Sequence, residues 1–225
     1  MLRDALLDAL ALVLPVECAG CGTPDRSLCT QCVAALARPP ERHELDDGTP
    51  AISALDYEGP VRRAILALKE SGRTDVARAL AVPLARAMTE ATAGLPGVSG
   101  RSRVEVLPVP TGRAAFRRRG YDPVALLVRR AGFPQVRLLA HSRAASQQKH
   151  LAVDERALNR AGTMRAIRRL DGRRFLLVDD VLTTGATLEE AARAVRVQGG
   201  EIVAAATLAY TRKRVQHPGV RSLNV

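Results

Sequence analysis

Val178-Asp179-Asp180-Val181-Leu182-Thr183-Thr184-Gly185-Ala186-Thr187 is the stretch that decides the fold of this chain. It continues an apolar run that begins at Phe175 and is typical of a buried strand. A helix is predicted from Thr187 to Gln198, where Gly199-Gly200 stops it. Open parallel sheets bind ligands beyond the carboxyl ends of their strands, so the loop between this strand and this helix is expected to form a binding site.

The loop combines the residue types that hold a phosphate group. Thr183, Thr184 and Thr187 supply hydroxyls, and Gly185 permits a close approach of the backbone. The N-terminus of the following helix adds N–H groups, which bind anions. The predicted ligand-binding residues of this loop are Val181, Leu182, Thr183, Thr184, Gly185, Ala186 and Thr187.

Two carboxylates, Asp179 and Asp180, precede this phosphate cradle and discriminate between ligands. An anion pair repels a bare phosphate, whereas sugar hydroxyls donate to carboxylates and Mg²⁺ binds between them. A ligand with a phosphate on one side of a ribose and a diol on the other fits both halves of the loop. The alternative is a Thr/Gly turn with Asp179 as a helix cap, but two acids at a buried strand end are costly without a ligand. The loop is neither a Walker A motif, which needs a Lys after the glycine, nor a GxGxxG motif.

Strands alternate with helices from Ala51 onward, which predicts a mostly parallel sheet covered by helices on both faces. Strands are expected at Ile52–Tyr57, Val104–Val109, Val136–Ala140, Phe175–Val178 and Ile202–Leu208. Helices are expected to begin at Pro60, to run from a Thr74 cap to Ala93, and to span Tyr121–Ala131, Asp154–Arg160 and Thr187–Gln198. The Pro- and acid-rich segment from Arg38 to Pro50 is interpreted as a linker.

All four cysteines lie within fifteen residues, as two CxxC pairs formed by Cys18, Cys21, Cys29 and Cys32. In a chain expected to be cytoplasmic, this spacing indicates a metal site rather than two disulfides. Four thiolates complete the tetrahedral geometry of structural zinc and leave no position open for catalysis. An iron–sulfur cluster and a redox pair of CxxC motifs are the alternatives, so the metal is not decided between zinc and another ion.

The net charge of +11 is unevenly distributed. Residues 1–60 carry a balance of −6, whereas residues 61–225 hold 30 basic and 13 acidic residues, a balance of +17. This charge favours polyanions such as nucleotides, pyrophosphate or nucleic acid, although solvated arginine-rich helix faces are the alternative. Three Phe, three Tyr and no Trp leave few rings for stacking on nucleic-acid bases. No stretch reaches the roughly 18 apolar residues of a bilayer span, so we expect no membrane insertion.

The loop resembles the ribose-phosphate signature of type I phosphoribosyltransferases, and nearly the whole chain resembles the ComF family (the ComFC/GntX type). In that family a four-Cys zinc module precedes such a domain. Further matching segments are Asp56–Arg62 with Leu68-Lys69 and Gly72-Arg73, Leu107–Pro110 with Arg117–Tyr121, and Gln148–Leu151 with Glu155–Asn159. The chain departs from the family pattern at Glu70-Ser71, Asp122-Pro123 and Thr163-Met164.

The resemblance implies an α/β fold of type I phosphoribosyltransferase type, with helices flanking a mostly parallel sheet. Residues 1–45 are expected to hold an N-terminal helix (Leu2–Leu14) and a small zinc-ribbon-like module, and residues 46–225 the phosphoribosyltransferase-type domain. The implied ligand is 5-phosphoribosyl-1-pyrophosphate with Mg²⁺. Asp179 and Asp180 would hold the ribose, and Thr183 to Thr187 the 5-phosphate.

Two cationic segments are candidates for the pyrophosphate side of the site. Lys69 follows an apolar helix and precedes Ser71-Gly72-Arg73. The alternative interpretation is that Lys69 is a solvated lysine at the end of a helix, where its charge complements the helix dipole. The run Arg117, Arg118 and Arg119 is expected on a loop near the acceptor or the leaving group. A solvated loop or a nucleic-acid contact is the alternative for this run.

Two functions from different classes follow from the resemblance. One is a transferase that moves the phosphoribosyl group to an unknown acceptor. The other is a non-catalytic module of DNA uptake in natural competence, which binds single-stranded DNA and partners with a helicase and a membrane channel. The sequence does not decide between catalysis and binding, and it is silent on the acceptor and the oligomeric state.

Overall fold

The computed structural model describes residues 16–24, 26–93, 104–142 and 162–212. The predicted helices Leu2–Leu14 and Asp154–Arg160 lie outside these residues, and so does the Gln148–Asn159 segment of the family resemblance. Among the described residues, no helix is long and apolar enough to cross a bilayer.

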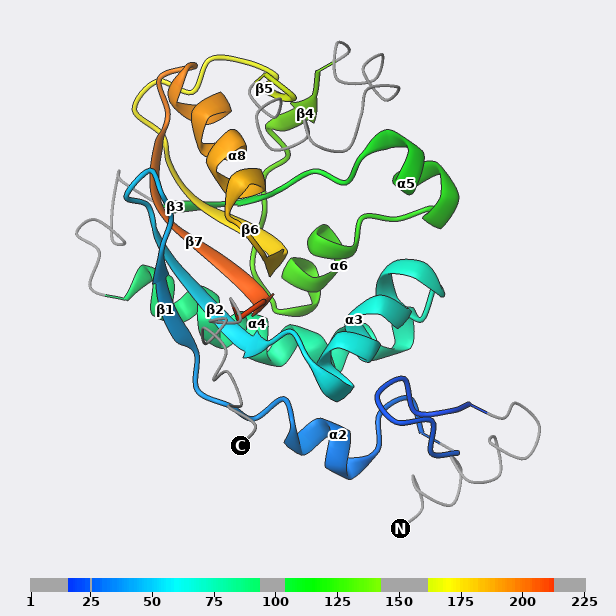
Figure 1. The fold of residues 1–225 in the computed structure, drawn as a ribbon. Helices are drawn as coiled ribbons and strands as arrows, with labels where there is room; N and C mark the ends of the chain where they lie inside the picture. The colour runs from blue at the N-terminus through cyan, green and yellow to red at the C-terminus, as the bar shows by residue number, and fades with distance from the viewer. Residues whose placement is uncertain (1–15, 25, 94–103, 143–161, 213–225) are drawn as a thin grey trace, which may run out of the picture.

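A five-stranded sheet forms the centre of the molecule, in the order β1-β2-β7-β6-β3 (Figure 1). Its strands are β1 (Glu41–Glu44), β2 (Pro50–Asp56), β3 (Val104–Pro108), β6 (Arg174–Leu182) and β7 (Glu201–Tyr210). The pairs β2–β7, β7–β6 and β6–β3 are parallel, and β1 alone pairs antiparallel, with β2. The predicted mostly parallel sheet is therefore confirmed.

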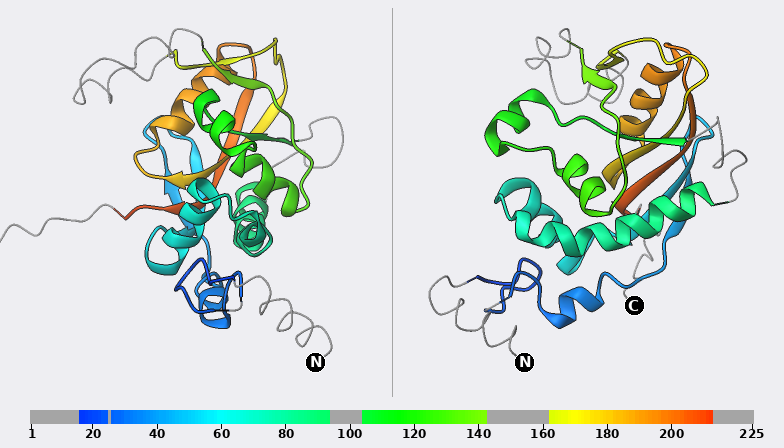
Figure 2. Two further views of the ribbon diagram at one scale, coloured as in Figure 1. Left: turned by 90° about the vertical axis from the view of Figure 1, so that its right-hand side faces the viewer. Right: turned by 180° about the vertical axis from the view of Figure 1, so that it is seen from behind.

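Helices cover both faces of this sheet (Figures 1 and 2). The helices are α2 (Thr30–Ala34), α3 (Gly59–Glu70), α4 (Ala77–Thr92), α5 (Arg113–Arg119), α6 (Pro123–Arg130) and α8 (Ala186–Arg196), with a 3₁₀ turn η1 (Thr74–Val76). The apolar residues of α3, α4 and α6 form one core cluster, whereas those of α8 form a second cluster on the opposite face. A small antiparallel pair, β4 (Leu139–His141) and β5 (Met164–Ala166), contributes to the α8 side.

Strand β6 has four successive apolar residues, Phe175–Val178, because both faces of the sheet are covered there. Leu176 and Val178 belong to the cluster of α3, α4 and α6, whereas Phe175 and Leu177 belong to the cluster of α8. Successive side chains of a strand point to opposite faces, so a strand between two helical layers must be apolar at every position. This is the physical reason why the apolar run predicted a central strand correctly.

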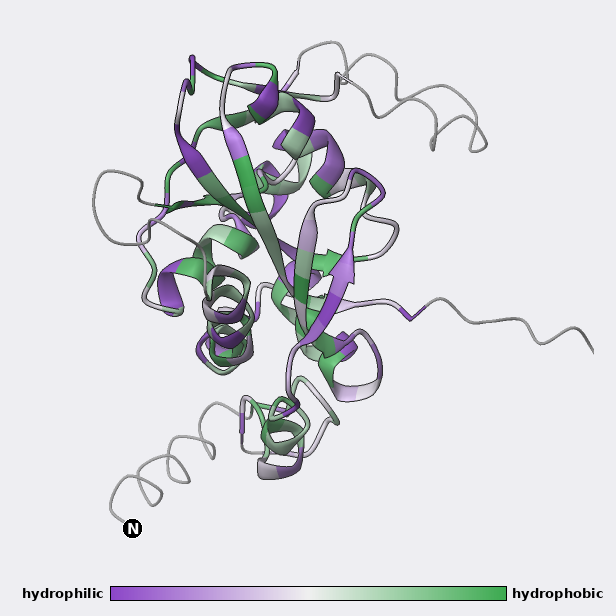
Figure 3. Cartoon of the chain, turned by 90° about the vertical axis from the view of Figure 1, so that its left-hand side faces the viewer, coloured by the Kyte–Doolittle hydropathy of each residue, from purple (hydrophilic) through white to green (hydrophobic). Residues whose placement is uncertain are grey.

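The predicted linker from Arg38 to Pro50 is wrong, because this segment contains strand β1. Its residues pair antiparallel with β2, with Glu41 opposite Ser53 and Glu44 opposite Pro50. Figure 3 shows β1 as hydrophilic along its length, in contrast to the central strand β7. A charged edge strand has no hydrophobic alternation to detect, and its charges protect the edge from pairing with other chains.

Two smaller expectations are also corrected. Thr74 does not cap a helix: it begins the 3₁₀ turn η1, and α4 follows from Ala77 without a side-chain cap. The strand expected at Val136–Ala140 is displaced to β4, although the Val136 N–H donates to the Val106 carbonyl at 2.9 Å. The helix start predicted at Pro60 is confirmed, since Pro60 lies in the first turn of α3.

Candidate functional site

The carboxyl end of β6 and the start of α8 present the candidate site. Strand β6 extends through Leu182, so Asp179 and Asp180 lie within its last four residues instead of following it. Thr183 and Thr184 are exposed in the turn, and Gly185 precedes α8 with a φ of 86°. The left-handed backbone favours glycine here, and a Cβ atom on Gly185 would also lie 3.2 Å from Leu45 Cδ2, a tight contact.

Lys69 is brought to this acid pair although it lies 111 residues away from Asp180 in sequence. Its Nζ atom lies 2.9 Å from Asp180 Oδ2 and 3.1 Å from Asp180 Oδ1. The Asp180 N–H donates to Asp179 Oδ1 at 2.8 Å. The side chains of Lys69 and Asp180 are only 27% and 14% exposed, so the pair is partly withdrawn from water. The three residues predicted as catalytic therefore form one contiguous group.

The electrostatics of the acid pair favour a proton, a cation or a hydroxyl donor between the carboxylates. Burial and then the negative charge of Asp180 raise the pKa of Asp179 to about 8, and a smaller upward contribution comes from Asp122. The Asp180 N–H and the charge of Lys69 oppose this rise only in part. The raised pKa of Asp179 favours its protonated form at neutral pH. The pair therefore suits a ligand with donor hydroxyls or a divalent cation.

The run of three arginines lies on helix α5, and its prediction as a loop is wrong. Arg118 and Arg119 both donate to Glu70 at the end of α3, and each of these N–O distances is 2.8 Å. Arg117 is exposed on the same helix. Glu70 thus neutralises part of the charge expected to face a leaving group, and it joins α5 to the helix that carries Lys69.

Two further residues near Lys69, Tyr121 and Asp122, were not assigned a role from sequence. The Tyr121 hydroxyl donates to the Leu68 carbonyl, next to Lys69. Asp122 caps α6 by accepting from the Ala125 N–H at 3.0 Å, and it also accepts from the Thr111 N–H at 3.0 Å. An Asp followed directly by Pro is a helix-start signal, so the cap could have been found from sequence.

A cavity of about 430 Å³ adjoins the threonines of the loop. It is lined by Thr183 and Thr184 on one side and by β1 and the end of β7 on the other. In its lining the His43 and Tyr210 rings are in contact, with their centroids 4.4 Å apart and their planes tilted by 50°. Sequence reasoning missed the side of this cavity that β1 forms, because β1 was interpreted as part of a linker.

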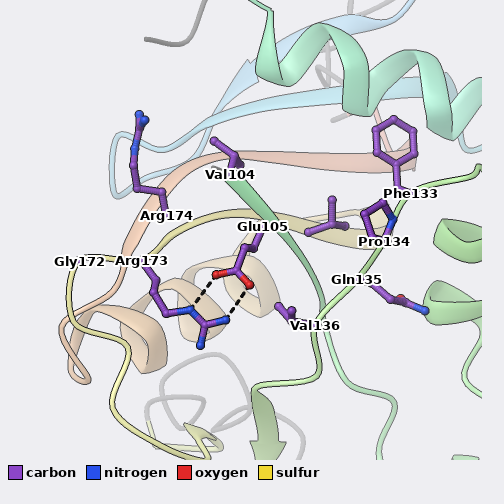
Figure 4. Close-up of a pocket in the computed structure, with 10 residues that line it drawn as sticks. Val104, Glu105, Phe133, Pro134, Gln135, Val136, Gly172, Arg173 and Arg174 are labelled. Atoms are coloured by element: carbon purple, nitrogen blue, oxygen red, sulfur yellow. Dashed lines mark hydrogen bonds and ion pairs between the residues drawn. The ribbon is translucent and has the colours of Figure 1, made fainter. Parts of the chain in front are cut away.

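A second cavity, of about 410 Å³, lies at the opposite edge of the sheet (Figure 4). It is lined by the amino ends of β3 and β6 together with the segment Phe133–Val136. Arg173 makes a two-point ion pair with Glu105, at 2.7 and 2.6 Å. Ligands of open parallel sheets bind at the carboxyl ends of the strands, and the charges of Arg173 and Glu105 satisfy each other, so the candidate site is not placed here.

The four cysteines meet at the N-terminal end of the described chain. The Sγ atoms of Cys18, Cys21, Cys29 and Cys32 all lie within 4.8 Å of one another. A tetrahedral thiolate site with Zn–S bonds of about 2.3 Å spaces its sulfurs by about 3.8 Å, so the cluster is of the right size. The Cys29 N–H donates to Cys18 Sγ at 3.3 Å, as in a metal knuckle. The cluster could therefore hold a metal ion such as zinc.

The surroundings of the sulfurs agree with a cation among them. Burial raises the pKa of the Cys18 thiol, but backbone N–H donors from Cys29, Gly20 and Cys21 outweigh it and lower the pKa to about 6. Burial and the neighbouring thiols raise the pKa of Cys32 instead. A Cβ atom on Gly20 would lie 2.5 Å from Cys32 Sγ, so glycine is needed for the sulfurs to converge.

Comparisons with known proteins agree with this geometry. Residues 117–221 match the family model described as the phosphoribosyl transferase domain. The DNA utilization protein YhgH of Escherichia coli K12 is 28% identical over 197 residues, which are 83% of this chain and 80% of that protein. YhgH of Salmonella typhi is 28% identical over 193 residues, with the same coverage of both chains.

Solved structures similar to this chain include two orotate phosphoribosyltransferases. The enzyme from Aeropyrum pernix is 19% identical, with a TM-score of 0.31 over 79% of this chain and 76% of that one. The enzyme from Mycobacterium tuberculosis is 21% identical, with a TM-score of 0.36 over 80% of this chain and 92% of that one. At these scores the fold assignment rests on the family match and on the strand order of the sheet.

Proposed function

We propose that this chain, which carries a phosphoribosyl transferase domain and resembles the DNA utilization proteins of the ComF family over most of its length, binds 5-phosphoribosyl-1-pyrophosphate with Mg²⁺. The observation that carries the proposal is the group formed by Asp179, Asp180 and Lys69 beside the threonine turn. Carboxylates that suit a ribose diol, a cation that suits a pyrophosphate and hydroxyls that suit a phosphate lie together at this end of the sheet, which supports the proposal.

Each part of the ligand has a matching group in the site. The 5-phosphate is assigned to the turn from Thr183 to Thr187, where hydroxyls and the N-terminus of α8 provide donors. The ribose hydroxyls are assigned to Asp179 and Asp180, and they would donate to these carboxylates in place of the proton that the raised pKa of Asp179 favours. Lys69 is assigned to the pyrophosphate, and its ion pair with Asp180 is the contact that ligand binding must exchange.

We infer phosphoribosyl transfer to an unknown acceptor as the reaction. The bond between C1 of the ribose and pyrophosphate breaks, and its electron pair leaves on the pyrophosphate oxygen. A nucleophilic atom of the acceptor then bonds to C1 and gives up its proton. Mg²⁺, which phosphoribosyltransferases commonly use, would neutralise charge on the pyrophosphate when bound. Lys69 would stabilise the leaving charge, and the acid pair would stabilise the positive charge that develops on the sugar.

The cysteine cluster is assigned to a structural Zn²⁺, held by Cys18, Cys21, Cys29 and Cys32. Four protein ligands complete its coordination, so no reaction step is assigned to this metal. A cytoplasmic location is part of the same proposal, and so is the division into a cysteine module within residues 1–45 and a phosphoribosyltransferase-type domain from residue 46, to whose sheet strand β1 (Glu41–Glu44) adds an edge.

A non-catalytic role in DNA uptake is the second candidate. The relatives named DNA utilization proteins favour it, and so does helix α5, where Phe116 is 45% exposed between Arg113 and Arg117. An exposed ring flanked by arginines is a stacking platform for single-stranded DNA. The helicase and channel partners remain an extension of the family resemblance.

Calorimetric titration with 5-phosphoribosyl-1-pyrophosphate and Mg²⁺ tests the proposal. Saturable binding by the zinc-loaded protein is expected, and Asp179→Asn/Asp180→Asn is expected to abolish it. Asp171→Asn is the matched control, because Asp171 is an exposed acid that precedes the amino end of β6, at the other end of this strand from the acid pair; this variant is expected to bind as the unaltered protein does. If the folded protein does not bind, the proposed ligand is wrong; single-stranded DNA binding with a steep salt dependence then favours the second candidate.

A further inference from the structure

The first cysteine knuckle lies beside helix α3 (Figure 1), and two arginines join the knuckle to the helix region. Near the start of α3, Arg63 Nε donates to the Gly20 carbonyl, between Cys18 and Cys21. Just beyond its end, Arg73 Nη1 donates to the Glu17 carbonyl at 3.0 Å. A Cβ atom on Gly20 would lie 3.3 Å from the Cβ atom of Pro60, so the knuckle also packs on the first turn of the helix.

These attachments are held in place by further contacts. Asp75 accepts from two nitrogens of Arg73, at 3.0 Å from Nε and 2.8 Å from Nη2, which fixes the direction of the guanidinium. Leu36, after the second knuckle, is 5% exposed in the same core cluster as α3 and α4. Arg86 of α4 donates to the Leu36 carbonyl. The cysteine module thus packs against helices α3 and α4 and is in contact with the rest of the fold.

The other side of α3 reaches the acid pair through its last turn. Lys69 pairs with Asp180, and the next residue, Glu70, holds Arg118 and Arg119 of α5. A displacement of α3 would therefore move the cation and the arginine helix together. The twelve residues of α3 span about 18 Å, and backbone hydrogen bonds connect its successive turns.

We propose that Arg63 and Arg73 are positioning residues that couple metal occupancy of the cysteine cluster to ligand binding at the acid pair. A metal ion fixes the two knuckle carbonyls, the two arginines carry that position to α3, and α3 sets the place of Lys69. This inference rests on the proposed function for its ligand. Coupling between two sites is reciprocal, so bound ligand must also strengthen the hold on the metal by the same factor.

The competing view is that the metal folds only its own corner of the chain. In that case the ligand would leave metal affinity unchanged, and the arginines would contribute only to stability. The two views differ in a measurable way, because only coupling makes metal affinity depend on the ligand.

The test compares three zinc-loaded proteins: the unaltered chain, Arg63→Gln/Arg73→Gln, and the control Arg130→Gln on the exposed end of α6. The double variant keeps all four cysteines. Zinc affinity is measured by equilibrium competition with a coloured chelator, with and without 5-phosphoribosyl-1-pyrophosphate in excess Mg²⁺. We expect the ligand to tighten zinc binding about tenfold, within the usual range of coupling, in the unaltered protein and in the control. In the double variant the ligand is expected to change the zinc affinity less than twofold.

Amide hydrogen exchange of the same zinc-loaded proteins provides a reading that needs no ligand. Exchange in the last turn of α3, Leu68 to Glu70, is expected to be faster in the double variant, while β7 keeps its protection. If the unaltered protein does not bind the ligand, the proposed function fails and this comparison alone decides whether the arginines position α3. Equal exchange of α3 in all three proteins, or ligand-dependent zinc affinity that survives in the double variant, overturns the inference.

Discussion

Replacing Asp179 by Asn should remove a specific pH dependence of stability. Asn has nearly the same shape and can still accept the Asp180 N–H, but it has no proton to lose. In the folded protein the pKa of Asp179 is raised to about 8 by burial and by Asp180, whereas an unfolded Asp titrates near 3.9. The folded chain therefore binds one more proton than the unfolded chain between these two values.

The sign and size follow from proton linkage. A raised folded-state pKa gives stability that is fully present below the unfolded pKa and is lost as the pH rises through about 8. Between pH 6 and pH 8 the loss of unfolding free energy amounts to about 2 kcal/mol for one such proton.

Urea unfolding of the zinc-loaded protein at half-unit steps between pH 6 and pH 8 measures this change. The unaltered protein should lose about 2 kcal/mol of unfolding free energy over that range, and Asp179→Asn should lose much less. Mg²⁺ should flatten the curve of the unaltered protein, because a bound cation replaces the proton. A flat curve without Mg²⁺, or an equal slope in the Asn variant, would show that the acid pair does not hold a proton near neutral pH.

Three further substitutions probe the same site. Lys69→Met should weaken binding of 5-phosphoribosyl-1-pyrophosphate by about 10- to 100-fold in calorimetry, because a hydrogen bond to a charged group contributes about 1.5–3 kcal/mol; unchanged affinity would remove Lys69 from the site. Gly185→Ala should lower the unfolding free energy in urea by about 1–2 kcal/mol, because alanine at a φ of 86° is strained; a neutral effect would contradict the left-handed turn. Glu70→Gln should cost about 1 kcal/mol in the same assay, because the side chains of Glu70 and Arg118 are 49% and 62% exposed, yet it should speed hydrogen exchange in α5. Unaltered protection of α5 would show that Glu70 does not hold this helix.

The central strand and the cysteine cluster were predictable because their signals are local. Phe175 to Val178 must be apolar at each position in a strand covered on both faces, and this pattern is visible in four consecutive residues. The two CxxC pairs are each formed by one turn of chain, so their spacing alone indicates converging sulfurs. The threonine turn was predictable for the same reason, since its hydroxyls and Gly185 are contiguous.

The parts that sequence reasoning missed depend on contacts between distant segments. Strand β1 is charged and short, and only its pairing with β2 makes it a strand. Helix α5 is short and its last turn is basic, so it has no apolar stripe to detect, and Glu70 holds it from another helix. The pairing of Lys69 with Asp180 joins positions 111 residues apart, and no local pattern contains that information.

The most direct test of the proposed site is a crystal structure of the zinc-loaded protein with 5-phosphoribosyl-1-pyrophosphate and Mg²⁺. We predict the 5-phosphate in the turn from Thr183 to Thr187, the ribose diol on Asp179 and Asp180, and Lys69 moved from Asp180 to the pyrophosphate. Ligand density at the opposite edge of the sheet, beside Arg173 and Glu105, would contradict the site, as would a Lys69–Asp180 ion pair left intact beside a bound ligand.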